Sequence, residues 1–166
     1  MRPVVYLAGA IIFVVFILAV VASGQNASAN DRTPGLVYVT VLNQSNVVLL
    51  HGEALYANTT DLQEVGLMNR SVFFCGKQGR ACIGELFDFN NRVNATSGTQ
   101  NPGICMWMKN TPMNLQQIWF NSTFSEVYDY QGQAESTASV CNGGLYVLET
   151  YPNVTIANAR IEINPG

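Results

Sequence analysis

The sequence has little charge. Asp, Glu, Lys and Arg make up 11% of its 166 residues, whereas about 25% is typical of a soluble domain. With only eight Lys and Arg and a net charge of -3, the chain lacks the positive surface that nucleic acids require, so we expect no nucleic-acid partner. His51 is the single histidine, which argues against a histidine-based metal cluster or a Ser-His-Asp triad. We therefore expect no metal, no cofactor and no catalytic residue, and we interpret His51 as a surface residue beside a turn.

The longest apolar run lies at the N-terminus. Residues 3–22 contain eighteen apolar residues and no charge, and Arg2 precedes them. This pattern is typical of a signal peptide or of an uncleaved membrane anchor, and the alternatives stay open because the run has anchor length but ends in small residues that suit cleavage. Both alternatives place the rest of the chain outside the cytoplasm. We predict a leader over residues 1–24 with a separate hydrophobic helix that can hold the chain in a membrane through residues 3–22, a flexible linker over 25–35, and one domain over 36–166.

Asn-X-Ser/Thr sequons are frequent. A sequon accepts a glycan only when it is translocated and accessible, so this frequency indicates an extracellular or cell-surface glycoprotein. The seven candidate glycosylation sites are Asn26, Asn43, Asn58, Asn69, Asn94, Asn121 and Asn153.

Cysteine usage points to the same compartment. All four cysteines lie beyond the leader, and their spacing matches no CxxC zinc or redox pattern. Two disulfides are the natural interpretation in an oxidising compartment. Of the three possible connectivities we favour Cys75–Cys82, which closes a short loop with glycines, and Cys105–Cys141, which ties distant strands.

Short runs of β-branched and aromatic residues follow one another from Leu36 onward. Gly, Asn and Pro separate them at intervals of about ten residues, which predicts an all-β domain, mainly an antiparallel sandwich or barrel. One stretch differs: Thr60 as N-cap and Gln63 form a capping box, which predicts a short helix from about Asp61 to Met68. The expected strands are 36–42, 47–50, 53–57, 72–75, 83–89, 104–109, 117–120, 126–130, 138–141, 145–150 and 155–163.

Four motifs occur in a recognisable order: GLMNR at 66–70, ELFDF at 85–89, MWMKNTPMNLQQIWF at 106–120 and YVLE at 146–149. This order is similar to that of the DUF192 (UPF0127) family, and the resemblance covers roughly residues 37–163. The resemblance implies a compact β-sandwich or barrel-like domain with a short helix in a largely prokaryotic family, many members of which are exported or membrane-anchored. It implies no reaction, because no biochemical function is established for the family. Sequons in such a family suggest an archaeal cell surface as a hypothesis.

The chain departs from the family pattern in three places. A Pro-Leu-Asp segment of the family is replaced at 113–116, so that Gln116 stands at the acidic position. Glu85 stands where the family has Met before Leu-Phe. The part after Tyr151 is shorter than usual. A site that depends on the lost aspartate is therefore not expected here.

The basic residues within the motifs suggest a binding site. We consider that Arg70, Trp107, Lys109 and Asn110 line a shallow polar site for a carboxylate or a sugar. The alternative, which we favour, is that Lys109 pairs with Asp88 or Glu85 and that Trp107 is part of the core. Exposed aromatic residues could add a sugar-stacking platform; the candidates are Trp119, which we assign to the core, Tyr128, Tyr130 and Tyr151.

Catalysis is the least supported function. Glu85, Asp88 and Asp129 could supply a carboxylate pair, but nothing in their spacing selects them. We expect a non-catalytic cell-surface module that binds carbohydrate or a small carboxylate. A structural or assembly subunit of the cell surface is the alternative, and a hydrolytic enzyme is a distant third. A binding module predicts a concave cluster with Lys109 and Arg70, whereas an assembly subunit predicts an open strand edge or an apolar patch.

Overall fold

The computed structural model describes residues 34–75, 79–90, 103–154 and 156–165. The predicted leader, most of the predicted linker, and the sequons at Asn26 and Asn94 lie outside the described residues. Strands dominate the described chain, and α2 (Thr60–Val65) is a single short helix among them. The predicted all-β class with one short helix is therefore confirmed. No helix among the described residues has both the length and the apolar character needed to cross a membrane.

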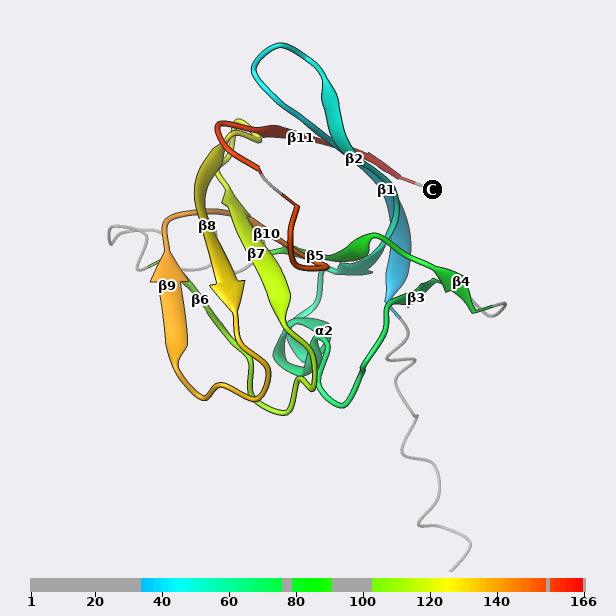
Figure 1. Cartoon of the computed structure of the whole chain (residues 1–166), viewed down its shortest axis with the longest axis vertical. Helices are drawn as coiled ribbons and strands as arrows, with labels where there is room; N and C mark the ends of the chain where they lie inside the picture. Colours follow the sequence, from blue (N-terminus) through cyan, green and yellow to red (C-terminus); the bar gives the residue numbers. More distant parts are fainter. Residues whose placement is uncertain (1–33, 76–78, 91–102, 155, 166) are drawn as a thin grey trace, which may run out of the picture. The chain divides into compact units, whose positions relative to one another are not determined.

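Seven strands form one main sheet (Figure 1). Across the sheet they are β11 (Arg160–Pro165), β1 (Gly35–Leu42), β2 (Val48–Ala57), β5 (Gly84–Asp88), β10 (Tyr146–Thr150), β7 (Leu115–Phe120) and β8 (Glu126–Gly132). Neighbouring strands are antiparallel except β2 and β5, which are parallel. The chain between β2 and β5 carries α2, as a parallel connection requires a crossover.

The main sheet curls until its two edge strands approach each other. The start of β8 meets the start of β11 through an antiparallel bridge between Ser125 and Arg160. Two backbone hydrogen bonds flank the bridge, from the Glu126 N–H to the Ala159 carbonyl (2.8 Å) and from the Ile161 N–H to the Phe124 carbonyl (2.9 Å). The curled sheet thus encloses an interior face, and the strands wrap around it in Figure 1.

The interior face is filled by apolar side chains that alternate along the strands. In β1, for example, Val37, Val39 and Val41 are buried while Tyr38 points outward, which is the two-residue period of a strand with one core face. The interior cluster consists of Val37, Val39, Val41, Ala54, Leu86, Ile118, Phe120, Leu148, Ile156, Ala159 and Ile161.

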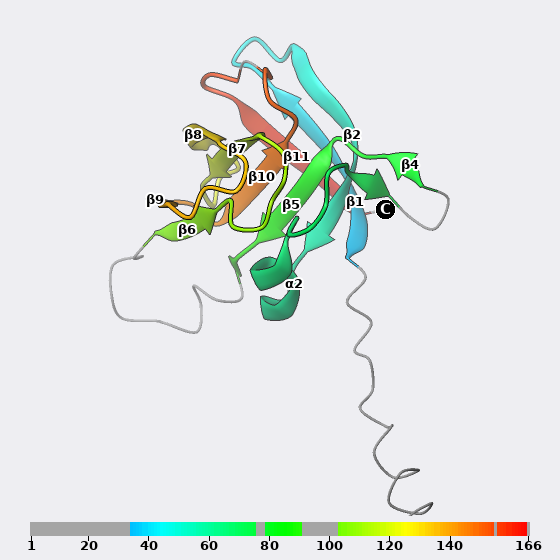
Figure 2. The same ribbon diagram turned by 60° about the horizontal axis from the view of Figure 1, so that its bottom comes forward.

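The opposite face of β2, β5, β10 and β7 is also buried, and we call it the covered face. It carries Ala57, Phe87, Trp119 and Val147, which pack with residues outside the main sheet. The cover includes α2, the segment 66–75 and the two-stranded ladder of β6 (Ile104–Trp107) and β9 (Ser139–Asn142). Figure 2 shows α2 beside β2 and β5.

The helix differs in detail from the expectation. Thr59, not Thr60, is the N-cap, and its hydroxyl accepts from the Leu62 N–H. Gln63 does not complete a capping box, because its Nε2 donates to the backbone carbonyls of Ala57 and Asp88. The helix ends at Val65, since Gly66 has φ 44°, and a Cβ there would lie 3.1 Å from Cζ of Phe87.

Several strand boundaries also differ. The two runs at 47–50 and 53–57 form one continuous strand, β2, and His51 lies exposed within it rather than beside a turn. The extra strand β4 (Arg80–Ala81) pairs with β3 (Phe74–Cys75). The predicted strand over 104–109 ends two residues early, at Trp107.

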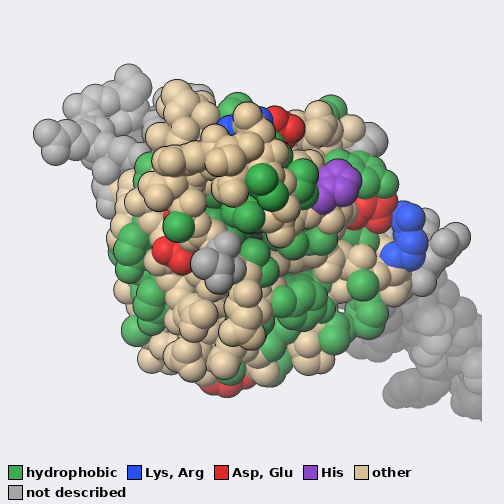
Figure 3. Space-filling model, turned by 45° about the horizontal axis from the view of Figure 1, so that its top comes forward, with side chains coloured by type: hydrophobic (Ala, Val, Ile, Leu, Met, Phe, Trp, Pro, Cys, Tyr) green, Lys and Arg blue, Asp and Glu red, His purple; other side chains and the backbone are tan. Residues whose placement is uncertain are grey.

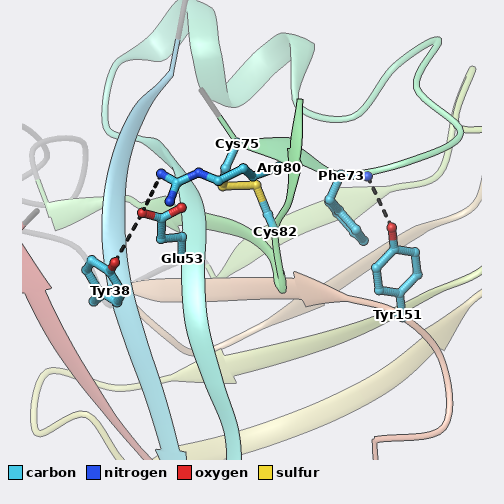
Figure 4. Close-up of a disulfide and its surroundings, with 7 residues drawn as sticks. All are labelled: Tyr38, Glu53, Phe73, Cys75, Arg80, Cys82 and Tyr151. Carbon is cyan, nitrogen blue, oxygen red and sulfur yellow. Dashed lines mark hydrogen bonds and ion pairs between the residues drawn. A yellow bond between two sulfur atoms is a disulfide. The ribbon is translucent and has the colours of Figure 1, made fainter. Parts of the chain in front are cut away.

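Both disulfides join the pairs that we favoured from the sequence, Cys75–Cys82 and Cys105–Cys141. The first joins the segment after α2 to the start of the β5 region (Figure 4). Close to it, Arg80 Nη2 donates to Glu53 Oε1 at 3.0 Å. The second lies between directly opposite residues of β6 and β9, so it fastens the ladder that covers the main sheet.

Candidate functional site

The WMKNT motif leaves β6 as a tight turn. The Thr111 N–H donates to the Met108 carbonyl at 3.1 Å, and Asn110 has φ 57°, a left-handed conformation that asparagine tolerates. The Asn110 carbonyl accepts from the Asn69 N–H at 2.6 Å. This hydrogen bond fastens the turn to the segment after α2, so that the GLMNR and WMKNT motifs lie together.

Trp107 and Lys109 are both exposed at this turn. Trp107 retains 46% of its accessible surface, and Nζ of Lys109 lies 5.2 Å from the centroid of its ring, within the range of a cation–π interaction. The favoured alternative from the sequence, with Trp107 in the core and Lys109 paired to Asp88 or Glu85, is therefore wrong. Trp107 faces outward from β6, and Asp88 accepts a hydrogen bond from the Tyr56 hydroxyl at 2.6 Å instead.

A row of polar side chains crosses the covered face beneath this turn. Glu85 on β5 lies directly opposite Glu149 on β10, and Glu149 lies directly opposite Gln117 on β7. Directly opposite residues point to the same face, with Cβ atoms about 5 Å apart. The three side chains retain 1%, 3% and 1% of their accessible surface, respectively.

The hydrogen bonds of this row are incomplete. Nε2 of Gln117 donates to Oε1 of Glu149 at 2.7 Å and lies 3.5 Å from the sulfur of Met108. Oε2 of Glu85 is buried and has no hydrogen-bond partner within the described part of the chain. Buried polar atoms are nearly always paired. This oxygen and Oε1 of Gln63, which also has no partner within the described residues, therefore leave unmet hydrogen-bonding capacity around the pocket.

Burial raises the pKa of both carboxyl groups. The pKa of Glu85 rises to about 8, first through loss of solvation and then through the charge of Glu149, while the positive charge of Arg70 acts in the opposite direction. Loss of solvation raises the pKa of Glu149 to about 7, and the hydrogen bond from Gln117 partly offsets this. Near neutral pH at least one of the two carboxyl groups therefore stays protonated, and a protonated carboxyl group can donate a hydrogen bond.

A small pocket joins the turn to this row. Its cavity volume is about 20 Å³, which is room for about one water molecule. The lining comes from the end of α2 and the residues after it, from the WMKNT turn and from the covered face: residues 63–68, Phe87, Met106, Trp107, Lys109, Thr111 and Glu149. Four segments that are far apart in the sequence therefore meet at one place.

The structure brings together part of the predicted site. Trp107 and Lys109 line the pocket, and Arg70 lies close enough to Glu85 to act on its charge. Asn110 contributes its backbone to the turn, and its side chain is not part of the pocket lining. Of the aromatic candidates, Trp119 is fully buried, as expected, whereas Tyr128 and Tyr151 are exposed.

Sequence reasoning missed the central pair. The sequence draws attention to Glu85 together with Asp88 and Asp129, and it does not single out Glu149 or Gln117. The sequence does contain a signal for this pair: Glu149 interrupts the apolar run YVLET, and Gln117 interrupts LQQIWF. Both runs form buried strands, so a polar residue within them is unusual. At the departure from the family pattern, Gln116 faces the interior and donates to Asp129 at 2.8 Å. Within the described residues, no group of three or more His, Cys, Asp and Glu could hold a metal ion.

The described sequons lie in turns, in loops or beside element ends, and none of their asparagines is fully buried. These asparagines are Asn43, Asn58, Asn69, Asn121 and Asn153. On the face shown in Figure 3, charged side chains are sparse, and uncharged polar atoms and backbone cover most of the surface. The low charge of the sequence is thus visible on the folded domain.

The fold is shared with two solved structures. A protein of Sinorhizobium meliloti 1021, proposed to be a transcription regulator, has a TM-score of 0.62 and 21% identity over 79% of this chain and 95% of its own. A protein of unknown function from Novosphingobium aromaticivorans DSM 12444 has a TM-score of 0.56 and 20% identity over 76% of this chain and 84% of its own. No family model and no curated protein matches the sequence. Similarity at these identities establishes only the fold, so any functional argument must come from the site.

Proposed function

We propose that this chain is an exported ligand-binding module of the DUF192 type, and that the pocket beneath the WMKNT turn takes the carboxylate of a small molecule. The observation that carries the proposal is the convergence of the four sequence motifs on this one pocket. Other residues of the motifs pack in the hydrophobic core, beside those that line the pocket. The lining residues supply a cation, an exposed aromatic ring and a buried acid within one small volume.

The charges at the pocket favour a carboxylate. Lys109 lines the pocket as an exposed cation, and Glu149, whose pKa is raised to about 7, supplies an O–H donor at the pH values at which it is protonated. Glu64 also lines the rim; both rim charges are exposed and solvent screens them alike, so the O–H of Glu149 is the donor that distinguishes a carboxylate inside the pocket. A carboxylate held between Lys109 and Glu149 accepts from both, with charge-assisted hydrogen bonds.

The dimensions set which part of the ligand enters. A cavity of about 20 Å³ admits about one ligand oxygen and leaves the rest of the molecule at the rim. There the exposed ring of Trp107 offers an apolar face for a sugar ring or an alkyl chain. Acidic sugars and simple carboxylic acids share the required chemistry.

The extracellular location belongs to the proposal. It is supported by two disulfides, which persist mainly in oxidising compartments, and by the turn and loop positions of the described sequons. The apolar segment 3–22, as a signal peptide or anchor, supplies export and, where it is retained, attachment to the membrane.

The test is calorimetric titration of the full-length protein, in a mild detergent at pH 6, with galacturonate, galactose and acetate. We expect galacturonate to bind at least tenfold more tightly than galactose, and acetate to report how much of the affinity the carboxylate alone supplies. Lys109→Ala should weaken galacturonate about tenfold, or about 1.4 kcal/mol. Arg160→Ala is the matched control, because Arg160 is an exposed cation paired with Glu162. Equal affinity for galacturonate and galactose, or no binding of any of the three, would overturn the proposal.

A further inference from the structure

The paired acids beneath the pocket have a further consequence, which rests on the proposed function. We propose that Glu85 and Glu149 hold one proton between them at neutral pH, and that the site binds a carboxylate ligand only together with this proton. The pair is thereby a specificity element: it selects an anionic group that can accept a hydrogen bond, and it makes binding depend on pH.

The geometry makes two ionised carboxylates untenable here. Glu85 and Glu149 are directly opposite on adjacent antiparallel strands, and both are buried. Two like charges at this separation repel strongly in a medium of low dielectric constant, and neither has water to stabilise it. At least one carboxyl group must therefore stay neutral near pH 7.

The neighbouring charges fix the number of protons at one. Arg70, in the segment after α2, acts on Glu85 with a single positive charge, which can balance one carboxylate. Lys109 from the turn and Glu64 from α2 lie at the rim and are exposed; they carry opposite charges. On the β7 side Glu149 meets the neutral Gln117. With one compensating cation, the stable state is one carboxylate and one carboxylic acid, as in other acid dyads.

The unpartnered oxygen fits this assignment. Nε2 of Gln117 holds Oε1 of Glu149, whereas Oε2 of Glu85 has no partner within the described residues. A proton shared by the pair gives this oxygen a partner, because an O–H on one carboxyl group donates to an oxygen of the other. When a carboxylate ligand enters, the shared proton resides on Glu149, whose O–H donates to a ligand oxygen, and Glu85 is then the carboxylate of the pair; above the late step this proton is taken up from solvent. When the proton is lost to solvent, the ligand meets a carboxylate and is repelled.

The first experiment tests the pair without any ligand. In the full-length protein labelled with ¹³C at glutamate, the carboxyl resonances are followed from pH 4 to pH 10, and Glu85→Gln and Glu149→Gln assign them. We expect both residues to respond to one late step above pH 7, because coupled acids titrate together. Glu162→Gln, an exposed glutamate on β11, should leave that step in place. Full ionisation of both carboxyl groups by pH 7 in the unmodified protein would overturn the shared proton, whether or not the variants fold.

The second experiment tests the link to the ligand. Calorimetry of galacturonate binding at pH 8, in buffers of different ionisation enthalpy, measures the protons taken up per ligand. We expect uptake of about half a proton at pH 8 that rises toward one at higher pH, and an affinity that falls about tenfold per pH unit above the late step. Glu149→Gln should remove most of the uptake. Binding without proton uptake would overturn the coupling between ligand binding and protonation of the pair, but it would not affect the proposal that the pocket binds a carboxylate. A late-titrating pair in a protein that binds no carboxylate would overturn the proposed function and keep the shared proton.

Discussion

The two buried faces of the main sheet differ in how their polar side chains are hydrogen-bonded. On the interior face, Gln116 donates to Asp129 at 2.8 Å and Thr150 donates to the Ile83 carbonyl at 2.6 Å, and the rest of the cluster is apolar. On the covered face, Glu85 and Glu149 are buried side by side, and one oxygen of Glu85 has no partner among the residues that the structure describes. Burying such a pair costs free energy. The interior therefore stabilises the fold. The covered face holds two acids that lower the stability of the domain, so their presence points to a function.

The strongest test of this difference is a cavity in the interior. Leu148 is fully buried on the central strand β10, so Leu148→Ala should lower the free energy of unfolding by about 4 kcal/mol. Denaturant unfolding followed by circular dichroism measures the loss. Galacturonate affinity under folding conditions should stay within about twofold, because Leu148 points away from the pocket. A variant that loses binding but little stability would contradict the separation of the two faces.

Removing the disulfide of the cover should have the next largest effect. The Cys105–Cys141 bond closes a segment of 36 residues, so Cys105→Ser with Cys141→Ser should cost about 3 kcal/mol. The cost should fall on the ladder of β6 and β9, because the bond joins only these strands. Amide hydrogen exchange should accelerate there and in the WMKNT turn before it accelerates in β1 or β10. Uniform acceleration over the whole domain would show that the cover and the interior unfold as one unit.

The acid pair should make stability depend on pH. The pKa of Glu85 is raised to about 8 and that of Glu149 to about 7, above their values in an unfolded chain, so the folded protein binds more protons than the unfolded chain between about pH 4.5 and pH 8. The free energy of unfolding therefore falls as the pH rises through this window, by about 1.4 kcal/mol per pH unit for each excess proton. Burial also raises the pKa of Glu126, which adds a slope of the same sign.

The variant Glu149→Gln isolates the contribution of the pair. Its side chain stays neutral, so it should match the unmodified protein at pH 5 and melt several degrees higher at pH 8.5. Thermal unfolding at both pH values measures this, with Glu162→Gln as the exposed control. Equal melting temperatures of the variant and the unmodified protein at pH 8.5 would show that ionisation of Glu149 does not lower the free energy of unfolding.

The smallest effect on stability is expected at the rim of the pocket. Lys109 is exposed and contacts Trp107, so Lys109→Ala should change the free energy of unfolding by less than about 1 kcal/mol. Its effect on galacturonate affinity should be about tenfold. Denaturant unfolding and calorimetry on the same preparation separate the two quantities. A large loss of stability would contradict this prediction and show that Lys109 serves mainly to stabilise the fold.

The sequence predicts the fold well because strand alternation and turn residues are local signals. The runs at 36–42 and 145–150 correspond to β1 and β10, and both disulfide pairs agree with the expectation. Errors arise where side chains compete for partners. Gln63 has the right spacing for a capping box, yet it donates to carbonyls of neighbouring strands, which the local sequence does not reveal.

The site could be predicted only in part. Trp107, Lys109 and Arg70 stand out because basic and aromatic residues within motifs are visible in the sequence. The pairing of Glu85 with Glu149 depends on β5 and β10 being neighbours, 64 residues apart in the chain and aligned in one register. No periodicity encodes that adjacency, and the raised pKa values follow from it.

The central claim is that ligands bind at the pocket on the covered face. The most direct measurement is amide chemical-shift mapping of the ¹⁵N-labelled full-length protein at pH 6 during titration with galacturonate. We predict that the largest changes occur at residues 63–68, 107–111 and 149, and that galactose at the same concentration causes far smaller ones. Changes confined to other parts of the domain, or equal responses to the two sugars, would contradict it.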